Sequence, residues 1–154
     1  MATVESLTAD IDRVIAYFNA RKMDLPDDFF DRKTQFVING APFETLLGQS
    51  PSDPLVLMLS RGPAGFRFTA KALQHAIPDA RLERPSTPVA PSSTDPLSLR
   101  TELRLTGQLR GTNEAVTAVI PITLKLNDTG QVEVAEARMD ADTLEKIREA
   151  RRRS

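Results

Sequence analysis

In its second half the chain reads Leu97-Ser98-Leu99-Arg100-Thr101-Glu102-Leu103-Arg104-Leu105-Thr106, with apolar and polar side chains in alternation. Thr101 takes the place of a leucine in the apolar series. A period of two is the pattern of a β-strand that has one apolar and one polar face. The segment therefore predicts a strand, with Arg100, Glu102 and Arg104 together on its polar face.

Three other segments read as strands: 34–38, 116–126 and 132–139. The last two flank the turn Asn127-Asp128-Thr129-Gly130, whose glycine can adopt a positive φ. Together with the strand at 97–106, they predict an antiparallel meander toward the C-terminus.

Apolar side chains at helical spacing predict two helices, over 7–22 and 64–77. The first helix places its apolar residues on one stripe: Leu7, Ile11, Val14, Ile15 and Phe18. Shorter helices are expected over 42–47 and near the C-terminus, where Asp140 or Asp142 would cap the first turn. Helices followed by an antiparallel sheet predict an α+β fold.

The 154 residues include 20 basic and 21 acidic side chains, which gives a formal net charge of −1. This balance offers no strong field of one sign to hold a nucleic acid or an anionic membrane. The absence of cysteine excludes disulfides, thiolate catalysis and zinc–thiolate sites, and a single histidine excludes a His-rich metal site. We therefore expect no metal, no nucleic acid and no membrane partner.

The length fits one domain over 1–150, followed by a basic tail at 151–154. The polar and proline-rich segment 84–96 is interpreted as a flexible surface loop within this domain. No apolar run approaches the roughly 20 residues that span a bilayer, and the N-terminus lacks the pattern of a signal peptide. The chain is expected to be cytoplasmic.

Four short motifs accompany this order of elements: Asn19-Ala20, Ala76-Ile77-Pro78-Asp79-Ala80, Thr106-Gly107 with Gly111, and Asp128-Thr129-Gly130-Gln131-Val132. With them the chain resembles the nuclear transport factor 2-like superfamily. The last three motifs are similar to those of the SnoaL-like polyketide cyclases. The resemblance implies a cone-shaped fold, in which a curved antiparallel sheet wraps around a long N-terminal helix and leaves an internal pocket.

The resemblance also implies a function. SnoaL-like and ketosteroid isomerase-like proteins suggest an isomerase, cyclase or hydrolase that uses acid/base chemistry, without a cofactor, on a polyketide, terpenoid or steroid-like substrate. The alternative is a non-catalytic module of the same fold that binds a small apolar molecule or dimerises. A third possibility is an interaction protein that uses the polar face of the sheet and the basic tail. A homodimer through the sheet is expected from the superfamily.

Four residues are candidates for acid/base catalysis. His75 is one because a histidine titrates near neutral pH. Arg100 and Glu102 have the Arg-x-acid spacing of limonene epoxide hydrolase-like proteins, in which carboxylates activate water and protonate the substrate. Asp140 is the nearest equivalent of an acidic residue near the closing strand of SnoaL-like cyclases. Each also has a structural alternative: a surface histidine, an exposed strand face or a helix cap.

Ligand contacts are expected from six residues: Tyr17, Phe18, Phe30, Phe36, Asn39 and Thr123. The positions at which isomerase-like and epoxide hydrolase-like proteins carry catalytic side chains fall on non-titratable residues: Val14, Ile38, Thr123 and Ala137. These missing groups favour the binding alternative. Two titratable side chains that face one closed cavity would indicate catalysis, whereas an apolar cavity with the polar groups outside would indicate binding.

Overall fold

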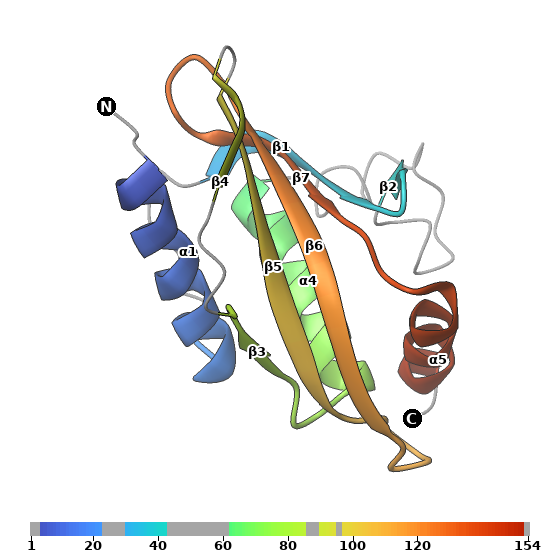
Figure 1. Cartoon of the computed structure of the whole chain (residues 1–154). Coiled ribbons are helices and arrows are strands. Elements are labelled where there is room, and N and C mark those ends of the chain that lie inside the picture. Colours follow the sequence, from blue (N-terminus) through green and yellow to red (C-terminus); the bar gives the residue numbers. More distant parts are fainter. Residues whose placement is uncertain (1–3, 23–29, 43–61, 86–89, 95–96, 153–154) are drawn as a thin grey trace.

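The computed structural model describes residues 4–22, 30–42, 62–85, 90–94 and 97–152 (Figure 1). The helix expected over 42–47 lies outside these ranges except for its first residue. The described helices are α1 (Val4–Asn19), α4 (Gly62–Ala76) and α5 (Ala141–Arg152). The described strands are β1 (Phe30–Ile38), β2 (Ala41–Pro42), β3 (Arg81–Glu83), β4 (Ala90–Thr94), β5 (Leu97–Gln108), β6 (Ala115–Leu126) and β7 (Val132–Ala137).

The strands form one sheet in the order β2-β1-β7-β6-β5-β3, and β4 also pairs with β5. β5 and β6 make a long antiparallel hairpin, with a register that runs from Ser98 opposite Lys125 to Gln108 opposite Ala115. The described strand pairs are antiparallel except β1 with β7, which is parallel. The long strands curve (Figure 1), and the expected α+β fold with a curved sheet is confirmed.

Both predicted long helices are present and pack on the same face of the sheet. α1 buries the whole predicted stripe, and all of its members except Phe18 pack with Leu99 and Leu124. α4 contributes Ala70 to a second cluster with Leu105 and Ile120, which share the face of Leu99 and Leu124. Figure 1 shows α4 behind β5 and β6, with α1 to one side and α5 to the other. Among the described helices, none combines the length and the apolar character that crossing a membrane requires.

The proline-rich segment 84–96 contains a strand that its sequence does not indicate. β4 pairs with the start of β5, from Ala90 opposite Arg100 to Thr94 opposite Leu97. The prediction of a flexible loop is wrong for these residues, because proline is compatible with an edge strand. β3 is a second unpredicted strand, and it pairs with the other end of β5. Both short strands depend on β5 for their hydrogen-bond partners.

Two asparagine side chains join segments that are far apart in the sequence. At the end of α1, Asn19 donates from Nδ2 to the carbonyl of Leu82 (2.7 Å) and accepts at Oδ1 from the Leu82 N–H (2.8 Å). After β1, Asn39 makes the same pair of bonds with the backbone of Met139, both at 2.8 Å. Asn19 thereby ties the end of α1 to β3, and Asn39 continues the pairing of β1 with the segment that follows β7.

The corner after α4 packs closely against the end of β5. Gly107 lies so near the Ile77 and Asp79 side chains that a Cβ atom on it would overlap the Ile77 methyl group. Asp79 accepts a hydrogen bond from the backbone N–H of Gln108 (2.8 Å). Arg110 donates from Nε to the carbonyl of His75 (2.7 Å), at the end of the helix. Two of the three motifs that resemble SnoaL-like proteins, at 76–80 and 106–107, therefore pack against each other at this corner.

Candidate functional site

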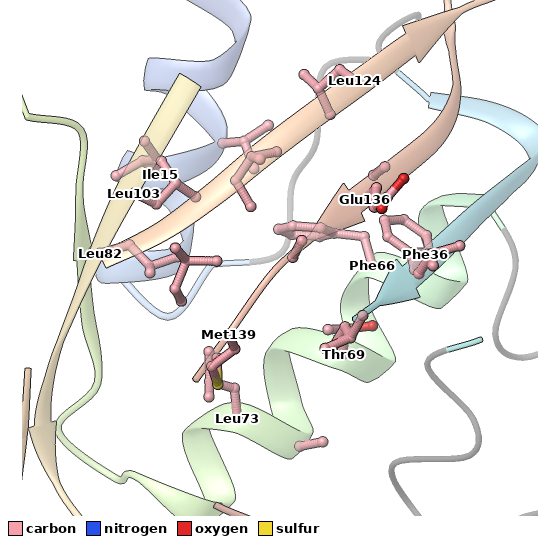
Figure 2. Close-up of a pocket in the computed structure, with 18 of the residues that line it drawn as sticks. Ile15, Phe36, Phe66, Thr69, Leu73, Leu82, Leu103, Leu124, Glu136 and Met139 are labelled. Carbon is pink, nitrogen blue, oxygen red and sulfur yellow. The ribbon is translucent and has the colours of Figure 1, made fainter. Parts of the chain in front are cut away.

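A cavity of about 230 Å³ lies between the helices and the inner face of the sheet (Figure 2). Its wall includes residues of α1, α4 and α5 on one side and residues of β1, β5, β6 and β7 on the other. The accessible surface of the wall is almost entirely apolar. Ligand sites in proteins are typically concave, mostly apolar and supplied with few polar groups, so this cavity is the candidate site.

The same periodic patterns that predict the elements also produce the cavity wall. Thr101 and Leu103 face it from the inner side of β5, and Ile122 faces it from the neighbouring β6. Phe66 and Leu73 belong to the apolar stripe of α4, yet both are only half-buried. They line the cavity, and side chains that border an unfilled space keep part of their surface accessible.

Three phenylalanines form an aromatic cluster on the wall. The rings of Phe30 and Phe66 are stacked with centroids 5.4 Å apart, and Phe36 meets Phe30 edge-on at 5.5 Å. Figure 2 shows Phe36 on β1 near Phe66 on α4. Such ring pairs add to the stability gained from burial. They also give an apolar ligand a rigid surface, because ring packing holds each side chain in place.

Four polar residues are among those that line the cavity: Thr69, Thr101, Glu136 and Arg148. The Thr69 hydroxyl donates to the Gly65 carbonyl of its own helix (2.8 Å). Glu136 forms an ion pair with Arg138 at 3.4 Å, and Arg148 forms one with Glu145 at 3.4 Å. Within the described part of the chain, the Oγ1 atom of Thr101 is buried and has no hydrogen-bond partner.

The four predicted catalytic residues are not on the cavity wall. His75 is exposed near the end of α4, and Asp140 is exposed before α5. Arg100 and Glu102 are exposed on the outer face of β5, because the strand alternation that directs Thr101 inward directs both of them outward. The geometry therefore does not support acid/base roles for these residues at this cavity.

All four have the structural alternatives that the sequence left open: His75 is an exposed histidine, and Arg100 and Glu102 belong to an exposed strand face. Asp140 caps α5, since its Oδ2 accepts a hydrogen bond from the Thr143 N–H (3.1 Å). Asp142, the other predicted cap, lies within the first turn of the helix. Glu102 stands opposite Pro121 on the solvent-facing side of the β5–β6 hairpin.

Of the six predicted ligand contacts, Phe30 and Phe36 lie on the wall. Phe18 is buried in the core cluster instead, with the Arg21 guanidinium 5.6 Å from its ring centroid. Tyr17 is half-buried and does not line the cavity. For Asn39, the structure shows the pair of bonds to Met139 described above.

Thr123, the sixth predicted contact, also lies off the cavity wall. It pairs with Arg100 on one side and with Glu136 on the other, between the inward-facing Ile122 and Leu124. Strand alternation directs its side chain away from the cavity, as it does that of Arg100.

The positions assigned to missing catalytic groups are informative. Val14, Ile38 and Ala137 all line the cavity. The three positions that the resemblance assigns to catalytic groups therefore border this cavity, and all three carry aliphatic side chains. Glu136 is a lining residue that sequence reasoning did not select, because alternation along the strand assigns it to the face opposite Ala137.

Neither a family model nor a curated protein matches the sequence. Solved structures do match it in three dimensions. A Jannaschia sp. CCS1 protein assigned as a SnoaL-like polyketide cyclase superposes with a TM-score of 0.63 at 14% identity, covering 92% of this chain and 90% of that one. A Bacillus subtilis protein assigned as an isomerase gives 0.63 at 15%, over 91% and 90%. An NTF2-like protein of unknown function from Exiguobacterium sp. 255-15 gives 0.60 at 18%, over 86% and 98%.

These similarities extend over nearly the whole length of each chain. At 14–18% identity they show the fold and not the activity. The chain has the nuclear transport factor 2-like fold, also called cystatin-like, and the resemblance inferred from its motifs is confirmed at this level.

Proposed function

We propose that this protein binds a small, uncharged and mostly apolar organic molecule in the cavity between its helices and sheet. The apolar wall is the observation that carries the proposal. Val14, Ile38 and Ala137 support it, because aliphatic side chains stand where related enzymes would need polar groups. This is the binding alternative of the sequence analysis. The polyketide, terpenoid or steroid-like ligand class comes from the resemblance alone.

A second candidate function is acid/base catalysis without a cofactor in the same cavity. Glu136 favours it, because it is the one acidic residue among those that line the cavity within the described part of the chain. A positioned carboxylate can act as a general base toward a bound substrate. Proteins with this fold include ones assigned as isomerases and polyketide cyclases. The reaction class would be an isomerisation, cyclisation or hydrolysis.

The two candidates share a binding step, which one pair of substitutions tests. Ala72 of α4 lines the cavity, whereas Ala64 of the same helix is exposed. Ala72→Leu should fill part of the cavity and displace a bound molecule, while Ala64→Leu is the matched control. Native mass spectrometry of freshly isolated protein would show an apolar molecule in the wild type and the control, and its loss from Ala72→Leu.

Equal retention of the molecule in Ala72→Leu and the control would place its binding elsewhere and contradict the proposal. The same spectra give the subunit number, and a monomer would contradict the expected homodimer. Conversion of the identified molecule by the wild type but not by Glu136→Gln would decide in favour of catalysis. Unchanged ligand in the presence of either protein would decide in favour of binding.

A further inference from the structure

The Thr101 side chain is the one place where the cavity region has an unsatisfied polar group within the described residues. The residue is 7% exposed, and its hydroxyl oxygen is shielded from solvent without any hydrogen-bond partner. Buried polar groups are nearly always paired, so each exception requires a physical explanation. Leucine occupies the flanking inward positions 99 and 103. An aliphatic residue at 101 would complete the apolar face without leaving a hydrogen bond unmade.

Two other buried or half-buried threonines show that the fold pairs such hydroxyls elsewhere. Thr34 of β1 donates to the carbonyl of Val132, and Thr69 of α4 donates to the carbonyl of Gly65. Both partners are backbone carbonyls. Among the described residues, no backbone carbonyl accepts a hydrogen bond from the Thr101 hydroxyl.

We propose that Thr101 is the polar anchor of the ligand, and that its hydroxyl forms a hydrogen bond with one hydroxyl or carbonyl oxygen of an otherwise apolar molecule. This inference rests on the proposed binding function. Threonine Oγ1 and Cγ2 exchange places by rotation about χ1 between staggered positions, so a small rotation barrier separates the shielded hydroxyl from one that faces the cavity. Bonding to the ligand would then satisfy a donor that the protein leaves unpaired.

The dimensions and charge of the cavity define the ligand further. Its volume of about 230 Å³ exceeds the roughly 150 Å³ of an apolar cavity that holds benzene, so it accommodates a ring system larger than six carbons. Both charged residues on the wall, Glu136 and Arg148, already take part in ion pairs. The chemistry favours a compact cyclic alcohol or ketone over a carboxylic acid or an amine.

Two matched probe molecules distinguish the hydrogen bond of Thr101 from apolar binding in the cavity. 1-Tetralone and tetralin share one bicyclic skeleton and differ by a carbonyl oxygen. Isothermal titration of the full chain would measure the affinity of each probe for the wild type and for Thr101→Val, which keeps the shape of the side chain without its hydroxyl. We expect Thr101→Val to weaken tetralone binding by about three- to tenfold, as for the loss of one neutral hydrogen bond, and to leave tetralin binding unchanged.

Thr69→Val is the matched control, because it makes the same chemical change on the same cavity at a hydroxyl that is already paired. The ratio of tetralone to tetralin affinity should stay at the wild-type value in this variant. Thr101→Ser should also retain the ratio, since it keeps the hydroxyl and loses only a methyl group. If Thr101→Val does not fold, Thr101→Ser still tests the role of the hydroxyl in a folded protein.

Three results would contradict the proposal that the Thr101 hydroxyl binds the ligand. An equal loss of both probes in Thr101→Val would assign Thr101 a packing role only. An unchanged ratio in that variant would show that the hydroxyl does not contact the oxygen, while the cavity itself would stand as a binding site. Absence of binding by both probes in the wild type would contradict the proposed function, and the anchor with it.

Discussion

Replacing Thr101 by valine should stabilise the ligand-free protein. An unpaired hydroxyl in the interior costs about 1–3 kcal/mol in protein mutational data. The Thr101 hydroxyl has no partner among the described residues, and the residue is only 7% exposed. Valine has the same branched shape, so it removes the unmade hydrogen bond without opening a cavity. A gain of about 1 kcal/mol corresponds to a rise in Tm of about 2–4 °C for a chain of this length.

Scanning calorimetry without added ligand is the direct assay, with urea unfolding as an independent measure of the free energy of unfolding. Thr69→Val is again the control, and the expected sign is opposite. Its hydroxyl is bonded to the Gly65 carbonyl at 2.8 Å, so its loss should lower stability by about 0.5–1.5 kcal/mol. Variants that differ only in which threonine is changed would therefore shift Tm in opposite directions.

A clear fall in the Tm of Thr101→Val would refute the reasoning, because it would mean that the hydroxyl is satisfied in solution. Ligand adds a second test. Saturating 1-tetralone should raise the Tm of the wild type more than that of Thr101→Val, since a ligand stabilises the folded state according to its affinity. Equal shifts in the two proteins would indicate that the hydroxyl is not part of the binding site.

Four further substitutions test the roles of residues that do not line the cavity. Gly107→Ala should lower the free energy of unfolding by about 1–3 kcal/mol, because the added methyl group would overlap the Ile77 side chain. An unchanged free energy of unfolding, measured by urea denaturation, would contradict this packing. Asn39→Ala should lose both bonds to Met139 and about 1–3 kcal/mol in the same assay, and its tetralin affinity should stay within twofold of the wild type. His75→Ala and Glu102→Gln should each leave the affinity for tetralone unchanged in isothermal titration, since neither residue lines the cavity. A tenfold loss of affinity in either variant would show that its residue contributes to the binding site.

The sequence predicted the elements whose signals are local. The stripe of α1 and the alternation of β5 both repeat within a few residues, and every predicted member of the α1 stripe is buried. The alternation also placed Thr101 and Arg100 on opposite faces of one strand, and the structure shows that the face of Thr101 is the inner one. Such patterns are sufficient for the α+β class, because each element must bury the face that its own side chains make apolar.

Features that depend on a remote partner segment could not be predicted from the sequence. β4 contains proline and no strand-forming pattern, and it is ordered through its pairing with β5. Asn39 was expected to contact ligand, but the structure brings Met139 beside it from 100 positions away. Neither the strand nor the asparagine contact has a signature in its own segment, because the partner that creates it is remote in the chain.

The sequence by itself thus determined which side chains share the apolar face of each element, and the fold turns these faces inward. Only the tertiary structure decided that these inward faces do not fully meet, and that a cavity of about 230 Å³ remains among them. The same packing decided that Thr101 enters this region without a partner, whereas His75, Arg100, Glu102 and Asp140 do not enter it. The physical reason is that a cavity is what remains after distant segments have packed, and no single segment encodes its volume or its polar groups.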